Sequence, residues 1–495
     1  AEIWVNGYLL GNMSGMFKPE YINITDFARI GQKNALAIKV YPVDMPGTIK
    51  PKQWGAAGEF HNGGDGNIGL NTTMLMSVGW DFTFNDGIRD RNTGIWKNIS
   101  LYATDKAVIR HPFIKSELSK PNYDLAKETV SVEVTNPTQR GIKCTVKGEI
   151  IGENITFSKD LNLFRGETKE ICFTPEEFPQ LTIKNPRLWW PKGYGSPYLY
   201  DANFTFKVGD KVSDSEDFKV GIRQMTFNEN NSILSLFING RRFIGRGGNW
   251  GFGESNLNYR GREYDIAVAY HADMNFTMMR NWVGQIGDKE LYEACDRHGI
   301  MIWQDFWLAN PSDGPDPYDP EMFIANAEDY VKRFRNHASI GIYCGRNEGF
   351  PPEQIDKALR RIVKEDHPGL HYISSSADEV VSGHGPYRAL PVKEYFSLKN
   401  GSDKFHSERG MPNVMNYESL VRTFSPEALW PQNAQWGQHD YTMEGAQSCA
   451  SFNAIIEKGF GKPNNAKEFA DLAQWVNYDG YRVALISFLV VLFTG

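Results

Sequence analysis

After residue 223 the sequence changes from strand-like segments alone to strand-like segments that alternate with helix-like ones, and this alternation constrains the fold most. The strand candidates are residues 243–247, 276–282, 300–305, 340–344, 372–374, 395–397 and 404–406. The helix candidates are residues 263–272, 288–298, 321–336 and a segment that begins at Pro351 and Pro352. Residues 224–495 contain neither a GxGxxG fingerprint nor a phosphate-binding P-loop. Repeated strand–helix units without a nucleotide signature predict a (β/α)8 TIM barrel over residues 224–495.

The first 223 residues have the period-two patterning of β-strands and no helical periodicity. Strand-like residues flank the turn formers Asn6 and Gly7, and residues 35–40 alternate strictly. We predict a jelly-roll β-sandwich over residues 1–105, which lacks its N-terminal part because the sequence opens on a strand that enters a hairpin. The spacing of turn signals in residues 106–223 predicts an immunoglobulin-like β-sandwich.

Composition narrows the classes of partner. The net charge is −7, the pI is about 5.9 and aromatic residues make up 13% of the chain. With no Lys/Arg-rich run, this balance argues against a nucleic-acid partner. The one long apolar run, residues 485–494, is about half the length needed to cross a bilayer, so we expect a buried strand and no membrane span.

The strand candidate at residues 340–344 ends at Gly345 and presents Asn347 and Glu348 directly afterwards. A carboxylate beside an amide at the end of a barrel strand is where a sugar-cleaving acid would lie, although a merely solvated glutamate is the alternative. Counted along the barrel, this strand is the fourth, and the segment that ends in Glu408 is the seventh. These strands face each other across a barrel mouth, so Glu348 and Glu408 are expected to oppose one another.

Several motifs carry a resemblance to glycoside hydrolase family 2. The pieces AEIWVNGYLLG, DFARIGQKNALAIKVYP, RNTGIWKNISLY, NPRLWWPKGYGSPYLY, FINGRRFIGRGGNWG, RFRNHASIGIYCGRNEG and FHSERG resemble that family in content and order. The stretch MMRNWVGQIGDKELYEACDRHGIMIWQDFWLANPSD resembles its β-mannosidase and endo-β-mannosidase branch. In that branch a Trp-Asp pair of the first domain reaches toward the substrate, and Trp80 and Asp81 match it.

The resemblance implies a retaining double displacement. Glu408 would be the nucleophile, Glu348 the acid/base, and Asn347 a hydrogen-bond partner of the sugar 2-hydroxyl. This mechanism needs carboxyl groups roughly 5–5.5 Å apart. It requires no cofactor or metal, and the sequence shows no ligand cluster for one.

Polar and aromatic residues at other strand ends are further candidates for substrate binding. Arg280 ends the second strand and is expected to hold Glu408 ionised, with a structural ion pair as the alternative. Asp305 is a candidate for binding a sugar hydroxyl. Trp303 is a candidate for the substrate site, with a place in the core as the alternative.

Two further tryptophans and a histidine complete the set. Trp282 and Trp436 are candidates for stacking on a sugar, although a lone Trp more often packs in a core. His384 lies in a Gly-rich loop, where it would line the pocket or cap a turn.

The expected partner is an oligosaccharide or glycoconjugate, and the expected reaction is the cleavage of terminal β-linked sugars in the manner of a β-mannosidase. Endo-β-mannosidase, exo-β-glucosaminidase and β-galactosidase activities of the same family are the alternatives, and a non-catalytic carbohydrate-binding protein is the alternative of another class. The family usually brings an aromatic residue under the sugar from its eighth strand, and residues 485–494 do not resemble that strand. The sequence does not indicate an oligomeric state, and a periplasmic or extracellular location is favoured over others.

Overall fold

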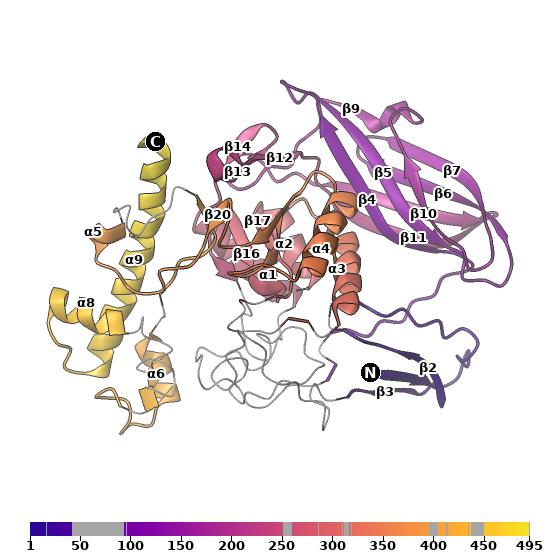
Figure 1. The fold of residues 1–495 in the computed structure, drawn as a ribbon. Coiled ribbons are helices and arrows are strands. Elements are labelled where there is room, and N and C mark those ends of the chain that lie inside the picture. The colour runs from indigo at the N-terminus through magenta and orange to yellow at the C-terminus, as the bar shows by residue number, and fades with distance from the viewer. Residues whose placement is uncertain are drawn as a thin grey trace.

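The structure is a computed structural model, and it describes most of the chain. The described residues are 1–15, 17–41, 94–95, 97–250, 260–285, 287–308, 310, 316–317, 319–395, 404–411, 414–433, 435–436 and 450–494, with side chains up to residue 483. Figure 1 shows the strands of the first half of the chain at one side, a mixed region in the middle and a group of helices at the other side.

The N-terminal residues form a three-stranded antiparallel sheet in the order β2-β1-β3. Its strands are β1 (Glu2–Val5), β2 (Tyr8–Asn12) and β3 (Leu36–Lys39). Asn6 and Gly7 both have positive φ angles, as a tight hairpin turn requires. This sheet belongs to the segment predicted as a jelly roll, of which residues 42–93 lie outside the described part.

Two antiparallel sheets packed face to face follow. One contains β4 (Val108–Leu118), β5 (Leu125–Thr135), β8 (Thr168–Phe173) and β9 (Thr182–Lys184), and the other contains β6 (Ile142–Ile151), β7 (Ile155–Leu163), β10 (Tyr200–Val208) and β11 (Lys211–Val220). A 3-10 turn, Pro179–Leu181, precedes β9. Alternate residues of each strand enter one apolar core, as period-two strands in a sandwich require.

A small antiparallel sheet and a parallel sheet come next. The small sheet consists of β12 (Met225–Asn228), β13 (Ser235–Ile238) and β14 (Arg241–Phe243). The parallel sheet runs in chain order through β15 (Asn249–Trp250), β16 (Met278–Asn281), β17 (Met301–Asp305), β18 (Ile340–Arg346) and β19 (His371–Ser375). Two short parallel strands, β20 (Val381–Ser382) and β21 (Phe405–His406), pair with each other. Every residue of β16, β17 and β18 is buried, as expected of parallel strands covered on both faces.

Helices connect the parallel strands and lie around them in Figure 1. They are α1 (Gly261–Asp273), α2 (Lys289–His298), α3 (Pro320–Phe334) and α4 (Glu353–Asp366). Two of them have clear capping residues: α2 ends at Gly299 with φ +73°, as its sequence indicates, and Asp319 caps α3 by accepting a hydrogen bond from the amide of Met322 at 2.9 Å.

The C-terminal part of the described chain is helical. It contains α5 (Val392–Tyr395), α6 (Tyr417–Thr423), α8 (Ala450–Phe460) and α9 (Ala466–Thr494). The prediction of a buried strand at residues 485–494 is therefore wrong, because these residues continue α9. A short apolar run has no periodicity that separates strand from helix, and the helix-compatible residues before it decide the outcome. Tyr395, where a strand over residues 395–397 was expected, ends the short helix α5, and residues 396 and 397 lie outside the described part.

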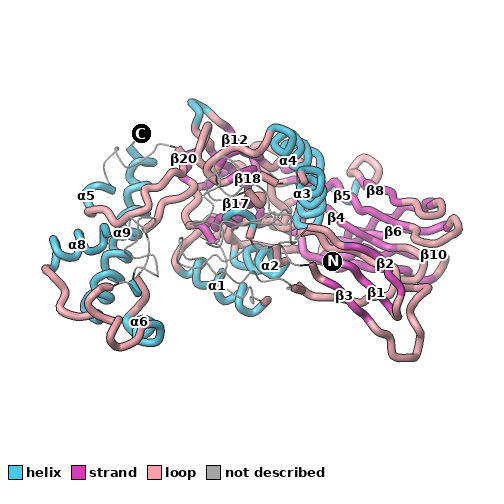
Figure 2. Tube along the Cα trace, turned by 60° about the horizontal axis from the view of Figure 1, so that its bottom comes forward, coloured by secondary structure: helices cyan, strands magenta, loops and turns pink. Residues whose placement is uncertain are grey.

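Specific hydrogen bonds fix the sandwich against the parallel sheet. The side chain of Asn336, just after α3, accepts from the amide of Ile114 at 3.0 Å and donates to the carbonyl of Pro112. Trp189 is fully buried and donates its indole N–H to the carbonyl of Asp296 at 2.9 Å. Figure 2 shows the result from another side, with the strands of the sandwich next to α3 and α4, and with α6, α8 and α9 at the opposite end.

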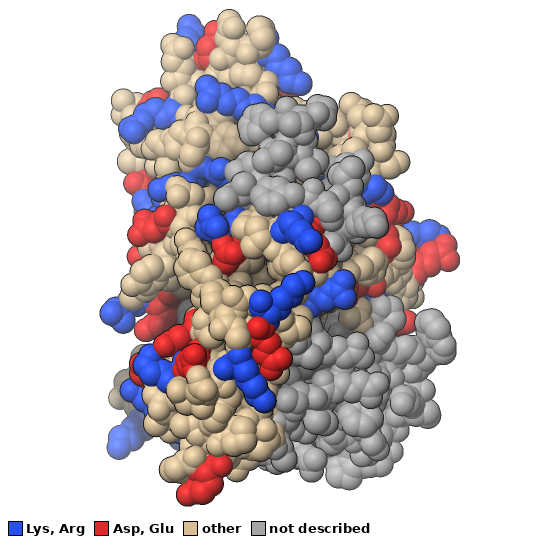
Figure 3. Space-filling model, turned by 90° about the vertical axis from the view of Figure 1, so that its left-hand side faces the viewer, with Lys and Arg blue, Asp and Glu red and all other residues tan. Residues whose placement is uncertain are grey.

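The structure thus contains several packed units of sheets and helices, as predicted. Figure 3 shows acidic and basic side chains interspersed over the face that includes the C-terminal helices, which fits the absence of a basic run in the sequence. Across the described residues, no helix combines the length and the apolar character needed to span a membrane.

Candidate active site

Glu348 stands at the carboxyl end of β18, the fourth parallel strand counted from β15. Its amide donates to the hydroxyl of Ser376 at 3.0 Å, and the amide of the preceding Asn347 donates to the carbonyl of Leu308 at 3.0 Å. Glu348 has a φ of +45°, a conformation that residues other than glycine adopt rarely. These contacts hold the backbone in the turn that directs the carboxyl group to the end of the sheet, and strain of this kind is common at functional sites.

Arg280 at the end of β16 connects the polar residues of neighbouring strands. Its guanidinium donates to Asp305 at 2.6 Å, to Glu408 at 2.8 Å and to the side-chain oxygen of Asn347 at 2.8 Å. Arg280 is only 3% exposed, so burial alone would lower its pKa, but the carboxylates of Asp305 and Glu408 raise the pKa above its usual value. The result is a permanent cation held between two strands' carboxylates.

Asp305 at the end of β17 is oriented by several donors besides Arg280. It accepts from the amide of Val283 at 3.0 Å and from the indole of Trp303 at 2.8 Å. Val283 has a φ of +45°, which is an outlier for a β-branched residue. The buried Asp305 therefore positions Arg280, and the predicted contact of Asp305 with a sugar hydroxyl gives way to this role.

Glu408 follows β21 and faces Glu348. One of its oxygens accepts from the side chain of Asn249 at 2.8 Å and from Arg280, and the other accepts from the hydroxyl of Tyr387. The same hydroxyl lies 2.5 Å from an oxygen of Glu348. One hydroxyl thus serves both carboxyl groups, so their facing oxygens lie within two hydrogen-bond lengths, about 5 Å, of each other.

Glu348 is held in its protonated form more strongly than an ordinary glutamate. Burial and then the negative charge of Glu408 raise its pKa to about 7, against the lowering effect of the hydroxyl of Tyr387. Its second oxygen accepts from the side chain of Asn310 at 3.3 Å. A substantial fraction of Glu348 is therefore protonated near neutral pH, as a group that gives a proton to a leaving oxygen must be.

Asn347 has its amide orientation fixed by its neighbours. The side-chain oxygen accepts from Arg280 and from the indole N–H of Trp282 at 3.0 Å. With the oxygen occupied, the amide nitrogen is the group left to donate to an incoming oxygen atom. Trp282 therefore belongs to the site, next to the predicted sugar-binding asparagine.

The remaining candidates have different outcomes. His384 lies 3.6 Å from Glu348 and 3.4 Å from Asp378, so it lines the site. Trp303 is 1% exposed, and its ring supports Asp305 and lies under Arg280. Trp436 is 2% exposed and packs against aromatic rings of the C-terminal helices, which corrects the prediction that it stacks on a sugar. Trp80 and Asp81 lie outside the described residues.

Sequence reasoning missed four side chains of the site: Tyr387, Asn249, Asn310 and Ser376. Asn249 was within reach, because it follows a strand candidate in the motif that opens the predicted barrel. Tyr387 lies in an irregular loop after β20, where no periodicity indicates which side chain points inward.

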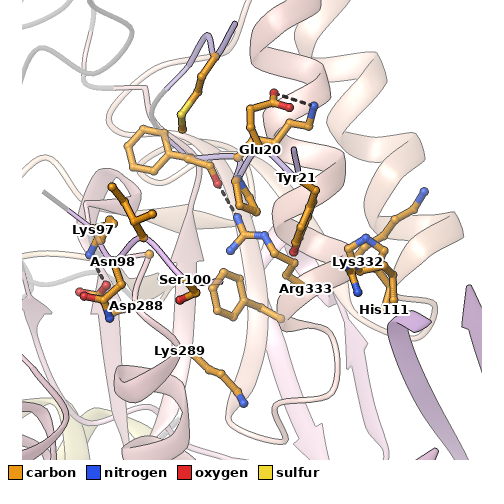
Figure 4. A pocket seen from close by; sticks show the side chains of 18 of the residues that line it. Glu20, Tyr21, Lys97, Asn98, Ser100, His111, Asp288, Lys289, Lys332 and Arg333 are labelled. Carbon is orange, nitrogen blue, oxygen red and sulfur yellow. Dashed lines mark hydrogen bonds and ion pairs between the residues drawn. The ribbon is translucent and has the colours of Figure 1, made fainter. Parts of the chain in front are cut away.

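The large cavity in Figure 4 is not this site. It has a volume of about 1700 Å³ and is lined by the N-terminal strands, the sandwich, α2 and α3, and neither Glu348 nor Glu408 is among its residues. Ion pairs such as that of Lys97 with Asp288 cross its wall. Glu348 and Glu408 lie elsewhere, at the carboxyl ends of the parallel strands.

Comparison with known proteins gives the family of the chain. The family model for glycosyl hydrolases family 2 matches residues 107–223, which form the sandwich. A mannosylglycoprotein endo-β-mannosidase of Lilium longiflorum is 30% identical over 98% of this chain and 56% of its own length. The chain belongs to glycosyl hydrolase family 2.

Other members of family 2 are similar along the same extent. An exo-β-D-glucosaminidase of Streptomyces avermitilis is 23% identical over 97% of this chain and 53% of its own length. The crystal structure of the Amycolatopsis orientalis exo-chitosanase CsxA has the same fold, with a TM-score of 0.78 at 20% identity over 98% of this chain and 56% of that one. A β-D-mannosidase from Dictyoglomus thermophilum gives a TM-score of 0.74 at 21% identity over 98% of this chain and 61% of that one. The chain spans about half the length of the curated relatives it matches.

Proposed function

We propose that this protein is a retaining glycoside hydrolase that cleaves β-mannosidic bonds. The observation that carries the proposal is the pair Glu348 and Glu408, whose oxygens share the hydroxyl of Tyr387 while Glu408 is bound to Arg280. Retaining enzymes have closely spaced carboxyl groups, whereas inverting enzymes need roughly 6.5–9.5 Å between them to admit a water molecule.

The proposed fold supports this reading. In it, β15 to β19 are successive strands of a (β/α)8 barrel, with β20 and β21 continuing it. The sandwich of β4 to β11 is immunoglobulin-like, and the N-terminal sheet is part of a jelly roll. Active sites of such barrels lie at the carboxyl ends of the strands, where Glu348 and Glu408 are found.

In the first step, Glu408 attacks the anomeric carbon while Glu348 gives its proton to the glycosidic oxygen, so the aglycone leaves as an alcohol. Arg280 favours the ionised nucleophile by donating to it. In the second step, Glu348 takes a proton from water, and the water oxygen displaces Glu408 from the anomeric carbon.

The preference for mannose rests on the similarity to the Lilium longiflorum enzyme, which exceeds that to the glucosaminidases by identity. Exo-β-glucosaminidase activity is the second candidate, supported by the common fold with the Amycolatopsis orientalis enzyme. The products released from an oligosaccharide distinguish exo from endo action. Exo action releases single sugars from the non-reducing end, whereas endo action cuts the chain internally.

The decisive experiment combines a substrate panel with covalent trapping. We expect nitrophenyl β-mannoside to be cleaved in preference to the β-glucosaminide and β-galactoside, and a 2-fluoro-mannosyl fluoride to label Glu408. Cleavage of the β-glucosaminide alone would replace mannose by glucosamine. Sugar binding without any turnover, unchanged by Glu408→Gln, would overturn the enzyme assignment.

A further inference from the structure

The loop from Ser382 to Tyr387 is attached to the strand that precedes Glu408. The amide of Ser407 donates to the carbonyl of Ser382 at 2.7 Å, and the amide of Gly410 donates to the carbonyl of Pro386 at 3.3 Å. This loop carries Tyr387, whose hydroxyl contacts both catalytic carboxyl groups. The loop's position therefore decides where that hydroxyl lies.

His406 contacts the same loop with both of its ring nitrogens. Nδ1 lies 3.1 Å from the carbonyl of Ser382, and Nε2 lies 3.0 Å from the carbonyl of Gly385. The two contacts differ in importance, because the carbonyl of Ser382 also accepts from Ser407. Gly385 is two residues from Tyr387, within the loop itself, so the Nε2 contact bears on the tyrosine.

The loop has little freedom to adjust elsewhere. Gly385 has a φ of +77°, and a Cβ atom placed on it would lie 2.9 Å from the ring of Tyr387. The turn is thus packed directly against the tyrosine ring. A displacement of Gly385 would move the ring and its hydroxyl together.

We propose that His406 is a positioning residue, which acts through its Nε2–H bond to the carbonyl of Gly385 and so holds the hydroxyl of Tyr387 between Glu348 and Glu408. The proposal rests on the proposed function, in which these two carboxyl groups do the chemistry. Both ring nitrogens of His406 lie against carbonyl groups of the loop, so its effect on the reaction passes through the loop, while the negative charge of Glu408 acts on the imidazole through space.

Two amide substitutions separate the two contacts. In His406→Gln the amide nitrogen can take the place of Nε2 and keep the bond to Gly385, whereas in His406→Asn the shorter side chain can replace only Nδ1. We expect kcat to fall ten- to a hundredfold in H406N, since misplacement by about 1 Å can cost on the order of a hundredfold, with little change in KM. H406Q should remain within about threefold of the unaltered protein, as should the control His298→Gln on α2.

A double-mutant cycle with Tyr387→Phe tests whether the effect passes through the tyrosine. The double variant H406N/Y387F should lose no more activity than Y387F alone, because the hydroxyl that His406 positions is already absent. The hydrogen bond from Tyr387 lowers the pKa of Glu348, so loss of this bond should raise that pKa. The basic limb of the pH profile, which is the fall in kcat/KM as Glu348 loses its proton, should therefore move to higher pH in both Y387F and H406N. A loss of stability alone would not move that limb.

Three results would overturn the proposal: equal losses in H406N and H406Q, multiplied losses in the double variant, or an unmoved basic limb in H406N. If H406N does not fold, the imidazole ¹⁵N shifts of the unaltered protein test the same bond, with the Nε2–H tautomer expected and Nδ1–H contradicting it. The activity of the unaltered protein separates a failure of the proposed function from a failure of the role given to His406. If the unaltered protein cleaves no glycoside, the proposed function is wrong, and the tautomer measurement alone then tests the bond from His406 to Gly385.

Discussion

At the scale of single residues, the different roles proposed for Glu348 and Glu408 rest on their different surroundings. Glu348 is partly buried beside a second carboxyl group, whereas Glu408 receives hydrogen bonds from a buried cation and an amide. Burial and the neighbouring carboxyl group thereby set Glu348 apart from an ordinary glutamate, as an acid that acts near neutral pH requires.

The acid role proposed for Glu348 predicts a dependence on the leaving group. Glu348→Gln should slow hydrolysis of an alkyl β-mannoside by about 10²–10⁴-fold, the usual contribution of general acid catalysis. The first step with a dinitrophenyl leaving group should change little, because that alcohol departs without protonation. Burst kinetics on the two substrates measure the difference, and equal losses on both would assign the acid elsewhere.

The raised pKa of Glu348 predicts the basic limb of the pH profile. Its pKa is about 7, and only the protonated form can act as the acid. The value of kcat/KM for the free enzyme should therefore fall as the pH rises above about 7. Initial rates at low substrate concentration from pH 5 to 9 measure this limb, and a limb near the ordinary glutamate value would contradict the assignment.

The site residues that could be predicted from the sequence directly follow strands with an unbroken apolar pattern. Glu348, Arg280 and Asn347 follow apolar runs whose ends meet at one edge of a parallel sheet, so their proximity could be predicted. Tyr387 could not be, because its place depends on the path of an irregular loop. Trp436 was misjudged because its burial depends on helices that pack against it from elsewhere in the chain.

At the scale of elements, β5 contains a glutamate in the middle of an apolar face. Glu128 is fully buried between Ala126 and Val130 on the inward side of the strand, and one of its oxygens accepts a hydrogen bond from the hydroxyl of Ser116 at 2.8 Å. Burial raises its pKa to about 7. The sandwich therefore folds with this group protonated.

Glu128 makes the stability of the sandwich depend on pH. Below the unfolded-state pKa of 4.5 the group is protonated in both states and costs nothing, and between 4.5 and about 7 only the unfolded state ionises. Stability should thus fall over this interval by on the order of 3 kcal/mol, at about 1.4 kcal/mol per pKa unit. Thermal unfolding at pH 5 and pH 8 should show a smaller loss for Glu128→Gln than for the exposed control Glu153→Gln, and equal losses would refute the assignment.

The elements differ in how well the sequence predicted them. Helices α2 and α3 have an apolar face at helical spacing together with a stop or cap residue, and both were expected within a few residues of their bounds. The period-two pattern of the sandwich predicted its strands equally well. The apolar residues 485–494 carry no such period, so the continuation of α9 could not be recognised.

At the scale of the whole molecule, the sandwich and the parallel sheet are joined by side chains that satisfy each other's backbone. Asn336→Ala removes two hydrogen bonds across the junction, to Ile114 and Pro112, and leaves both backbone groups partly buried. We expect a loss of about 1–3 kcal/mol and a broader or split calorimetric transition. The exposed-surface change Arg361→Ala should leave a transition like that of the unaltered protein, and an unchanged transition in N336A would show that the units are coupled by other contacts.

Arg280, described above as the connection between strands, also sets the net charge that a substrate meets. With Asp305 and Glu408 ionised and Glu348 protonated, the group around Arg280 carries one excess negative charge, and it carries two once Glu348 ionises. A mannose-shaped imino sugar that is positively charged should therefore bind more tightly than its neutral lactam, and the ratio of their inhibition constants should widen as the pH passes about 7. Such a site selects for the charge that a sugar acquires as its bond breaks, before any contact with the sugar's hydroxyl groups is considered.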